Sequence, residues 1–160
     1  MSRTKSTKGF SLIELLIVVA IIGIIAALAI PNLLASRRAA NEGSAQQSLR
    51  TIHSCQLTYQ ATTGHGDYGD LAGLRGEFLT DGVLGSGTKS GYIFEVHPTP
   101  AGTRPALFYA TAVPTVTAGV SQTGTRRFGI SEDAVMHGDA VALTPYADEN
   151  AVKSAPGTGN

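Results

Sequence analysis

Residues 8–31 read KGFSLIELLIVVAIIGIIAALAIP, and the rest of the chain is organised around them. The apolar run from Phe10 to Ile30 contains 21 residues, which would make about 31 Å of α-helix at about 1.5 Å per residue. The hydrocarbon core of a bilayer is about 30 Å thick. The stretch therefore predicts a helix that crosses a membrane close to the amino terminus.

Charged residues in and before this run add two expectations. Lys and Arg at positions 3, 5 and 8, with no acid among them, predict that the amino end stays in the cytoplasm. Glu14 is the one acidic side chain within the run. A carboxylate inside the apolar layer costs on the order of 3 kcal/mol, so Glu14 is a candidate functional residue that needs a partner.

The segment Gly9-Phe10-Ser11-Leu12-Ile13-Glu14 resembles the processing site of type IV pilins and type II secretion pseudopilins. The resemblance implies that a prepilin peptidase and methyltransferase cuts after Gly9 and methylates the new terminus at Phe10. It also implies that Glu14 is required for methylation and assembly. Residues 1–9 would be the cleaved leader, and 10–31 the transmembrane and assembly helix.

The same resemblance implies a location and partners. The precursor would cross the bacterial inner membrane once, and the mature chain would join a surface pilus or a periplasmic pseudopilus. Its partners would be copies of itself or other pilins, the inner-membrane assembly platform and membrane lipid. The sequence leaves the pilus and pseudopilus alternatives open.

The chemistry of the segment agrees with this interpretation. A cut after Gly9 frees an α-amine four residues before Glu14. The amine and the carboxylate can neutralise each other in a dry environment, within one helix or between neighbours, whereas an unpaired buried charge is costly. That such a pair would fix the axial register of subunits is implied by the resemblance alone.

Two other interpretations of the segment give Glu14 no role. Ala27-Leu28-Ala29 is similar to the cleavage site of a conventional secretory signal, which would place the mature terminus at Ile30. The second interpretation is a plain signal anchor, a membrane helix that is not cut. Either would make the chain an exported or membrane-anchored binding module, for calcium or DNA.

Beyond the membrane segment, the sequence predicts an α+β fold of the pilin-like lollipop type. A long helix from about Ser11 to Ala61 would be kinked by Gly23 and Pro31. Its amphipathic half, 32–62, carries a narrow apolar stripe at three- and four-residue spacing, made of Ala45, Leu49, Ile52 and Tyr59, with Cys55 or Gln56 between.

The globular head is expected over 63–147. Closely spaced glycines in 62–91 predict loops, with a short helical turn at 77–84. Strands are expected at 92–97, 106–113, 126–131 and 134–137, with a possible extension at 140–144. The short connections predict antiparallel pairing. Residues 148–160 are expected to be a disordered tail.

Little in the head suggests chemistry. Without the leader the chain has nine basic and twelve acidic side chains, which disfavours general nucleic-acid binding. Arg126 and Arg127 are too small a patch to change this, and a solvated strand edge explains them. Asp67 and Asp70 are weak metal candidates in a glycine-rich turn. No cofactor and no catalytic group is expected, so the chain is interpreted as a structural subunit and not an enzyme.

The lone cysteine, Cys55, excludes an intramolecular disulfide. This departs from the many pilins that close a carboxy-terminal loop with a cysteine pair. Cys55 is expected to be a buried apolar side chain. His53, on the same helix, is expected to be a satisfied or exposed polar residue.

Overall fold

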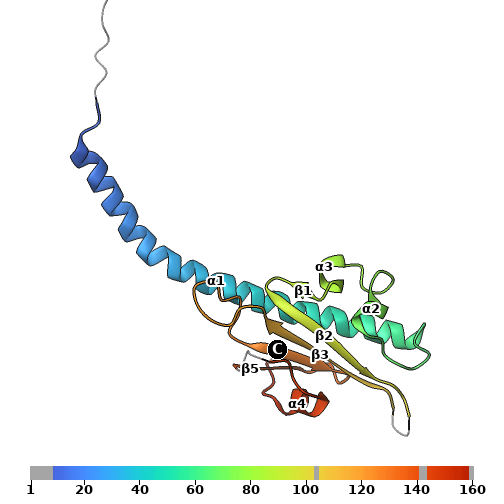
Figure 1. Ribbon diagram of the computed structural model, residues 1–160. Helices are drawn as coiled ribbons and strands as arrows, with labels where there is room; N and C mark the ends of the chain where they lie inside the picture. The colour runs from blue at the N-terminus through green and yellow to red at the C-terminus, as the bar shows by residue number, and fades with distance from the viewer. Residues whose placement is uncertain (1–8, 103–104, 141–143, 159–160) are drawn as a thin grey trace, which may run out of the picture. The chain divides into compact units, whose positions relative to one another are not determined.

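A computed structural model describes residues 9–102, 105–140 and 144–158. The chain forms two compact units that divide between Ser36 and Arg37, and each is described by itself. The long helix α1, Leu12–Ala61, crosses this division (Figure 1). Most of the predicted leader and the middle of the possible strand at 140–144 lie outside the described residues.

In the first unit, α1 continues through both predicted breakers, Gly23 and Pro31. A kink at these positions therefore stays a prediction. The large apolar side chains between Leu12 and Ile30 are 48–80% exposed. By length and composition this part of α1 can cross a membrane, and none of the residues in its most apolar window is buried within the described chain.

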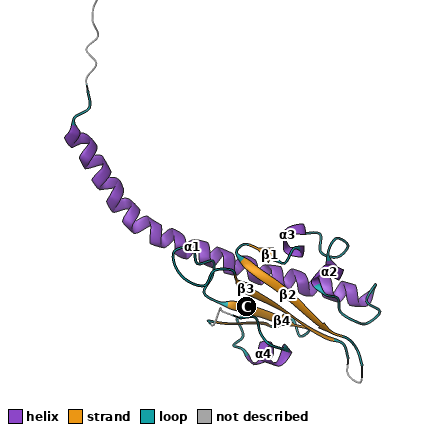
Figure 2. Cartoon of the chain, viewed as in Figure 1, coloured by secondary structure: helices purple, strands orange, loops and turns teal. Residues whose placement is uncertain are grey.

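The second unit contains a five-stranded antiparallel sheet in the order β1-β2-β3-β4-β5 (Figure 2). The strands are β1 Thr88–Lys89, β2 Tyr92–Thr99, β3 Leu107–Pro114, β4 Arg127–Ser131 and β5 Met136–Asp139. Each follows its neighbour in sequence, as expected for strands joined by short connections. The α+β class and the antiparallel sheet are confirmed.

The amphipathic half of α1 packs on this sheet through the predicted stripe. Ala45, Leu49 and Ile52 are fully buried in the same core as Phe108 and Phe128. Both Cys55 and Gln56 are also buried, between the predicted stripe positions. The apolar periodicity of the helix therefore identified the face that the sheet covers.

The loop region between α1 and the sheet differs in part from the expectation. Two single-turn helices form, α2 Leu71–Leu74 and α3 Gly82–Gly85, whereas the sequence predicted one helical turn over 77–84. Gly76 adopts a φ of +93°, which ends regular structure there. Asp81 then starts α3 because its carboxylate accepts from Val83 N and Leu84 N, both at 3.0 Å.

The prediction of a disordered tail from Asp148 is wrong for residues 148–158. They contain a short helix, α4 Glu149–Ser154, whose N-cap Asp148 accepts a hydrogen bond from Ala151 N at 2.7 Å. Val152 is fully buried, and it lies beside Gly129 of β4, where a side chain would meet it. The absence of a side chain at Gly129 gives α4 room to dock on the sheet.

We expect Gly124→Ala to destabilise the second unit. An added Cβ would lie 2.0 Å from the hydroxyl oxygen of Tyr92, and Tyr92 is fully buried and donates to Arg126 O at 2.9 Å. Overpacking of this kind costs about 1–3 kcal/mol, measurable as a lower free energy of unfolding.

Gly102→Ala is the matched control for Gly124→Ala, because nothing lies within 4 Å of its Cβ position. Tyr92→Phe in the Gly124→Ala background should recover part of the loss by removing the clashing oxygen. Equal stability of Gly124→Ala and Gly102→Ala would contradict the packing described here.

Candidate functional site

The residues that start α1 form a compact arrangement of their own. Gly9 and Phe10 are exposed and precede the helix. Ser11 occupies the N-cap position, and its backbone N–H donates to Glu14 Oε2 at 2.8 Å. Leu15 N then donates to Ser11 O at 3.3 Å. Glu14 is therefore the third helical residue, and its carboxylate reaches back to the cap.

This contact is one half of a capping box, in which an acid at the third helical position bonds to the N-cap amide. This role of Glu14 was not predicted, although the spacing Ser11-x-x-Glu14 is the sequence signal for it. A negative charge in the first turn also interacts favourably with the helix dipole. A carboxylate has more acceptor capacity than one amide uses, so Glu14 can accept further hydrogen bonds.

The two weak metal candidates bond to backbone instead. Asp67 Oδ1 accepts from Ala101 N at 2.7 Å, and Asp70 Oδ1 caps α2 by accepting from Gly73 N at 2.7 Å. In the part of the chain that the structure describes, no three His, Cys, Asp or Glu side chains gather in a metal-binding cluster. Both aspartates have structural roles here.

Cys55 and His53 also take part in packing. The Cys55 thiol donates to Phe78 O at 3.1 Å, and burial raises its pKa. A higher pKa lowers the thiolate fraction, which makes the side chain less reactive. The His53 ring lies 5.7 Å from that of Phe108. Neither residue is arranged as a nucleophile or ligand.

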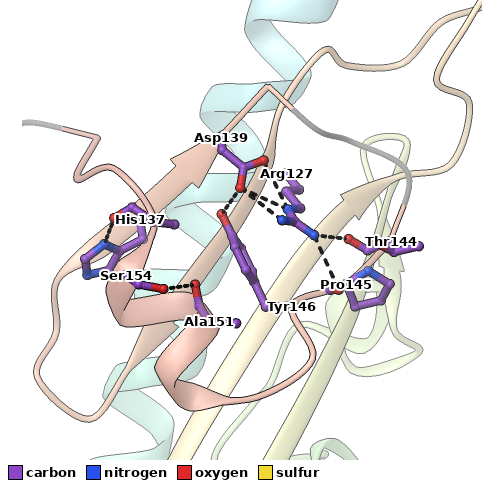
Figure 3. Close-up of polar contacts among 9 residues, drawn as sticks. Arg127, His137, Asp139, Thr144, Pro145, Tyr146, Ala151 and Ser154 are labelled. Carbon is purple, nitrogen blue, oxygen red and sulfur yellow. Dashed lines mark hydrogen bonds and ion pairs between the residues drawn. The ribbon is translucent and has the colours of Figure 1, made fainter.

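A cluster that we call the clasp holds the carboxy-terminal segment on the sheet (Figure 3). It consists of Arg127, Asp139, Tyr146 and the carbonyls of Thr144 and Pro145. Arg127 pairs with Asp139, with Nη2 3.0 Å from Oδ2, and its Nη1 donates to Thr144 O at 2.8 Å. The guanidinium lies 4.1 Å from the centre of the Tyr146 ring, within the range of a cation–π contact.

The clasp corrects one expectation about Arg126 and Arg127. Both were expected at a solvated strand edge, but Arg127 is partly buried against Tyr146 and paired with a carboxylate twelve residues away. Burial raises the pKa of Tyr146 to about 12, so its hydroxyl stays protonated and donates to Asp139 Oδ2 at 3.3 Å. The charged and polar groups of the clasp bond to one another, so the cluster stabilises the packing of the carboxy-terminal segment.

Further contacts extend the clasp to the end of the described chain. His137 Nδ1 donates to Ala155 O at 2.7 Å, and Gly138 N donates to Pro156 O at 3.0 Å. Lys153 bonds to both Glu132 and Glu149, and these two hydrogen bonds raise its pKa. These contacts fasten residues 144–158 in a chain whose single cysteine cannot close a disulfide.

We expect Arg127→Met to loosen residues 144–158. It removes the ion pair and the hydrogen bond to Thr144 O, and hydrogen bonds of charged groups contribute about 1.5–3 kcal/mol each. Amide hydrogen exchange in 144–158 should accelerate at least about tenfold. Arg126→Met is the matched control and should stay within about 0.5 kcal/mol of wild type. Unchanged exchange in Arg127→Met would show that the clasp does not hold the segment.

Comparisons with known proteins agree with the arrangement at the start of α1. Residues 4–30 match the family model of the prokaryotic N-terminal methylation motif. The chain is 52% identical over 56 residues to the type IV wide pilus major component PilA4 of Thermus thermophilus, which covers 35% of this chain and 43% of that protein.

Two further relatives each match part of the chain. The type IV major pilin protein PilA of Myxococcus xanthus is 44% identical over 52 residues, 32% of this chain and 24% of its own. The type IV major fimbrial protein FimA of Dichelobacter nodosus is 42% identical over 88 residues, 52% of this chain and 53% of its own. The chain thus spans about half or less of the relatives it matches. No solved structure was found to match it.

Proposed function

We propose that this chain, which carries the prokaryotic N-terminal methylation motif and is similar over part of its length to type IV major pilins, is the precursor of a type IV pilus subunit. One observation carries the proposal. The motif opens an apolar helix whose side chains from Leu12 to Ile30 are exposed in the isolated chain. Such a surface needs a membrane first and other helices afterwards.

Processing would occur at the exposed junction before α1. The peptidase would cut between Gly9 and Phe10, where the backbone is outside regular structure, and the methyl group would be added to the Phe10 amine. The basic leader supports a cytoplasmic amino end of the single-pass inner-membrane precursor.

Assembly would bundle the apolar helices of many copies, or of this chain and other pilins, in the core of a filament at the cell surface. The inner-membrane assembly platform would extract each subunit from lipid. Glu14 would then pair with the Phe10 amine of a neighbouring subunit, because a charge taken out of water needs an opposite charge beside it.

The pseudopilin of a type II secretion system is the second candidate, since the processing segment resembles both groups. The matched relatives carry pilus or fimbrial names, which favours the pilus subunit. An exported or anchored binding module is the alternative of a different class. It finds less support, because it gives the charge of Glu14 no partner in the apolar layer and leaves the methylation motif unexplained.

The amino-terminal residue and its mass, measured on protein recovered from cells, test the proposal. Processing as proposed leaves a mature chain that begins at N-methylated Phe10. A start at Ile30 would mean a conventional secretory signal and would overturn the role of Glu14. An uncut amino terminus would mean a plain signal anchor.

A further inference from the structure

A hollow of about 350 Å³ opens on the face of the sheet that points away from α1. Tyr92, Phe94 and Val96 of β2 are buried towards α1, so the alternate residues Ile93 and Glu95 point to the other face. The register of β2 and β3 places Ile93 beside Val113 and Glu95 beside Thr111, and these residues line the hollow.

The far wall of the hollow is fixed in place by the clasp. Pro145 lines the hollow. Arg127 Nη1 donates to two successive backbone carbonyl oxygens, Thr144 O at 2.8 Å and Pro145 O at 3.5 Å. Because this wall is held by hydrogen bonds, the hollow is formed before any ligand arrives, as is usual for small-molecule sites.

The lining combines apolar walls with one half-exposed carboxylate. Ile93, Val113 and Pro145 supply aliphatic surface, and among the described residues of the lining Glu95 is the only ionisable one. The Glu95 side chain is 46% exposed, and its Oε2 atom lies 3.4 Å from His97 Nε2. Thr111 is fully buried, and its hydroxyl has no hydrogen-bond partner within the described residues.

We propose that the hollow binds a primary ammonium group carried on a short aliphatic chain. The methylene groups would lie against Ile93, Val113 and Pro145, which removes apolar surface from water on both sides. The ammonium would donate to the half-exposed Glu95 carboxylate at the edge of this apolar surface.

Other ligand classes fit the lining less well. An anion would be repelled by the Glu95 carboxylate, and no lysine or arginine stands among the lining residues that the structure describes to offset the repulsion. A purely apolar ligand would desolvate the Glu95 carboxylate without giving it a partner, which is costly for a charged group. Charge and shape therefore both select an alkylammonium ion, either a free amine or a lysine of another copy.

Titration of the mature full-length chain with n-butylammonium tests the site, with the protein in nonionic detergent and its Ile and Val methyl groups labelled for NMR. The Ile93 and Val113 signals should shift and saturate. Glu95→Gln should weaken binding at least about tenfold, because it removes a charged hydrogen-bond partner. Glu77→Gln, which removes a carboxylate outside the lining, should leave binding unchanged.

Two further arms complete the test. n-Butanol, of the same length but neutral, should bind at least about tenfold more weakly than the ammonium. The methyl signals are also measured at several protein concentrations without added amine. Shifts that grow with protein concentration and disappear in Glu95→Gln would identify a lysine of another copy as the source of the ammonium group. Their absence would identify a free amine. Any of three results would overturn the proposal. These are methyl signals that do not shift to saturation, butanol that binds as well as butylammonium, and a Glu95→Gln variant that binds fully while the NMR signals of its sheet are unchanged. None of these outcomes depends on whether the chain forms a filament.

Discussion

A chain with Glu14→Ala is expected to enter the membrane and to be cut after Gly9, but to yield at least about a hundredfold fewer filaments. Loss of one partner from a buried charge pair costs about 3–5 kcal/mol, and each 1.4 kcal/mol is a factor of ten. In the proposed filament the substitution leaves the Phe10 amine unpaired in an apolar bundle. Membrane insertion should persist because the substitution only makes the helix more apolar.

The hydrogen bond from Ser11 N to Glu14 allows the two roles of this side chain to be separated. Gln at the third helical position can still accept from the N-cap amide, but it carries no charge. Glu14→Gln should therefore keep the start of α1 and fail in assembly almost as fully as Glu14→Ala.

Immunoblots of the sheared surface fraction measure filaments, and mass spectrometry of the membrane fraction measures cutting and methylation. Wild-type filament yield from Glu14→Ala would contradict the role proposed for the charge. Normal yield from Glu14→Gln combined with loss in Glu14→Ala would transfer that role to the helix cap.

Gly9→Leu is expected to leave nearly all of the protein as uncut precursor. Gly9 directly precedes the proposed scissile bond, and it lies in exposed, irregular backbone where a peptidase can bind an extended chain. A branched side chain at this position would obstruct that binding. The mass of the membrane-bound protein should exceed that of the mature form by the nine leader residues.

Gly43→Leu is the matched control for Gly9→Leu. It adds the same side chain to α1 at a position where nothing lies within 4 Å of the new Cβ, and it should be cut as efficiently as wild type. A mature form of normal mass from Gly9→Leu would show that the cleavage site is elsewhere.

The features that the sequence predicted well are those set by local pattern. The apolar run, the stripe through Ala45, Leu49 and Ile52, and the strands around Phe94 and Phe128 each follow from periodicity over a few residues. The structure places all of them within one or two residues of the expected bounds.

The features that the sequence did not predict depend on contacts between distant residues. The clasp joins Arg127, Asp139 and Tyr146, and nothing in the neighbourhood of any one of them indicates the other two. The hollow requires the register of β2 against β3, which sets Glu95 beside Thr111. Helix α4 has a local sequence signal, because Asp148 can cap it and Glu149 and Lys153 can pair within it. Its docking on the sheet, however, depends on the distant Gly129.

Residues 157–158 lie along the edge strand β5, and this matters where many copies of the chain are packed at high density. Thr158 N donates to Met136 O at 2.9 Å, and Gly157 bridges His137, so the chain's own end occupies hydrogen-bonding positions that an open edge would offer to a neighbour. At the other edge, β1 has two residues and β2 contains Pro98, which has no N–H to donate. Unprotected edges are templates for runaway sheet growth. Both edges of this sheet are therefore poor seeds for amyloid-like aggregation, even where many copies are crowded together.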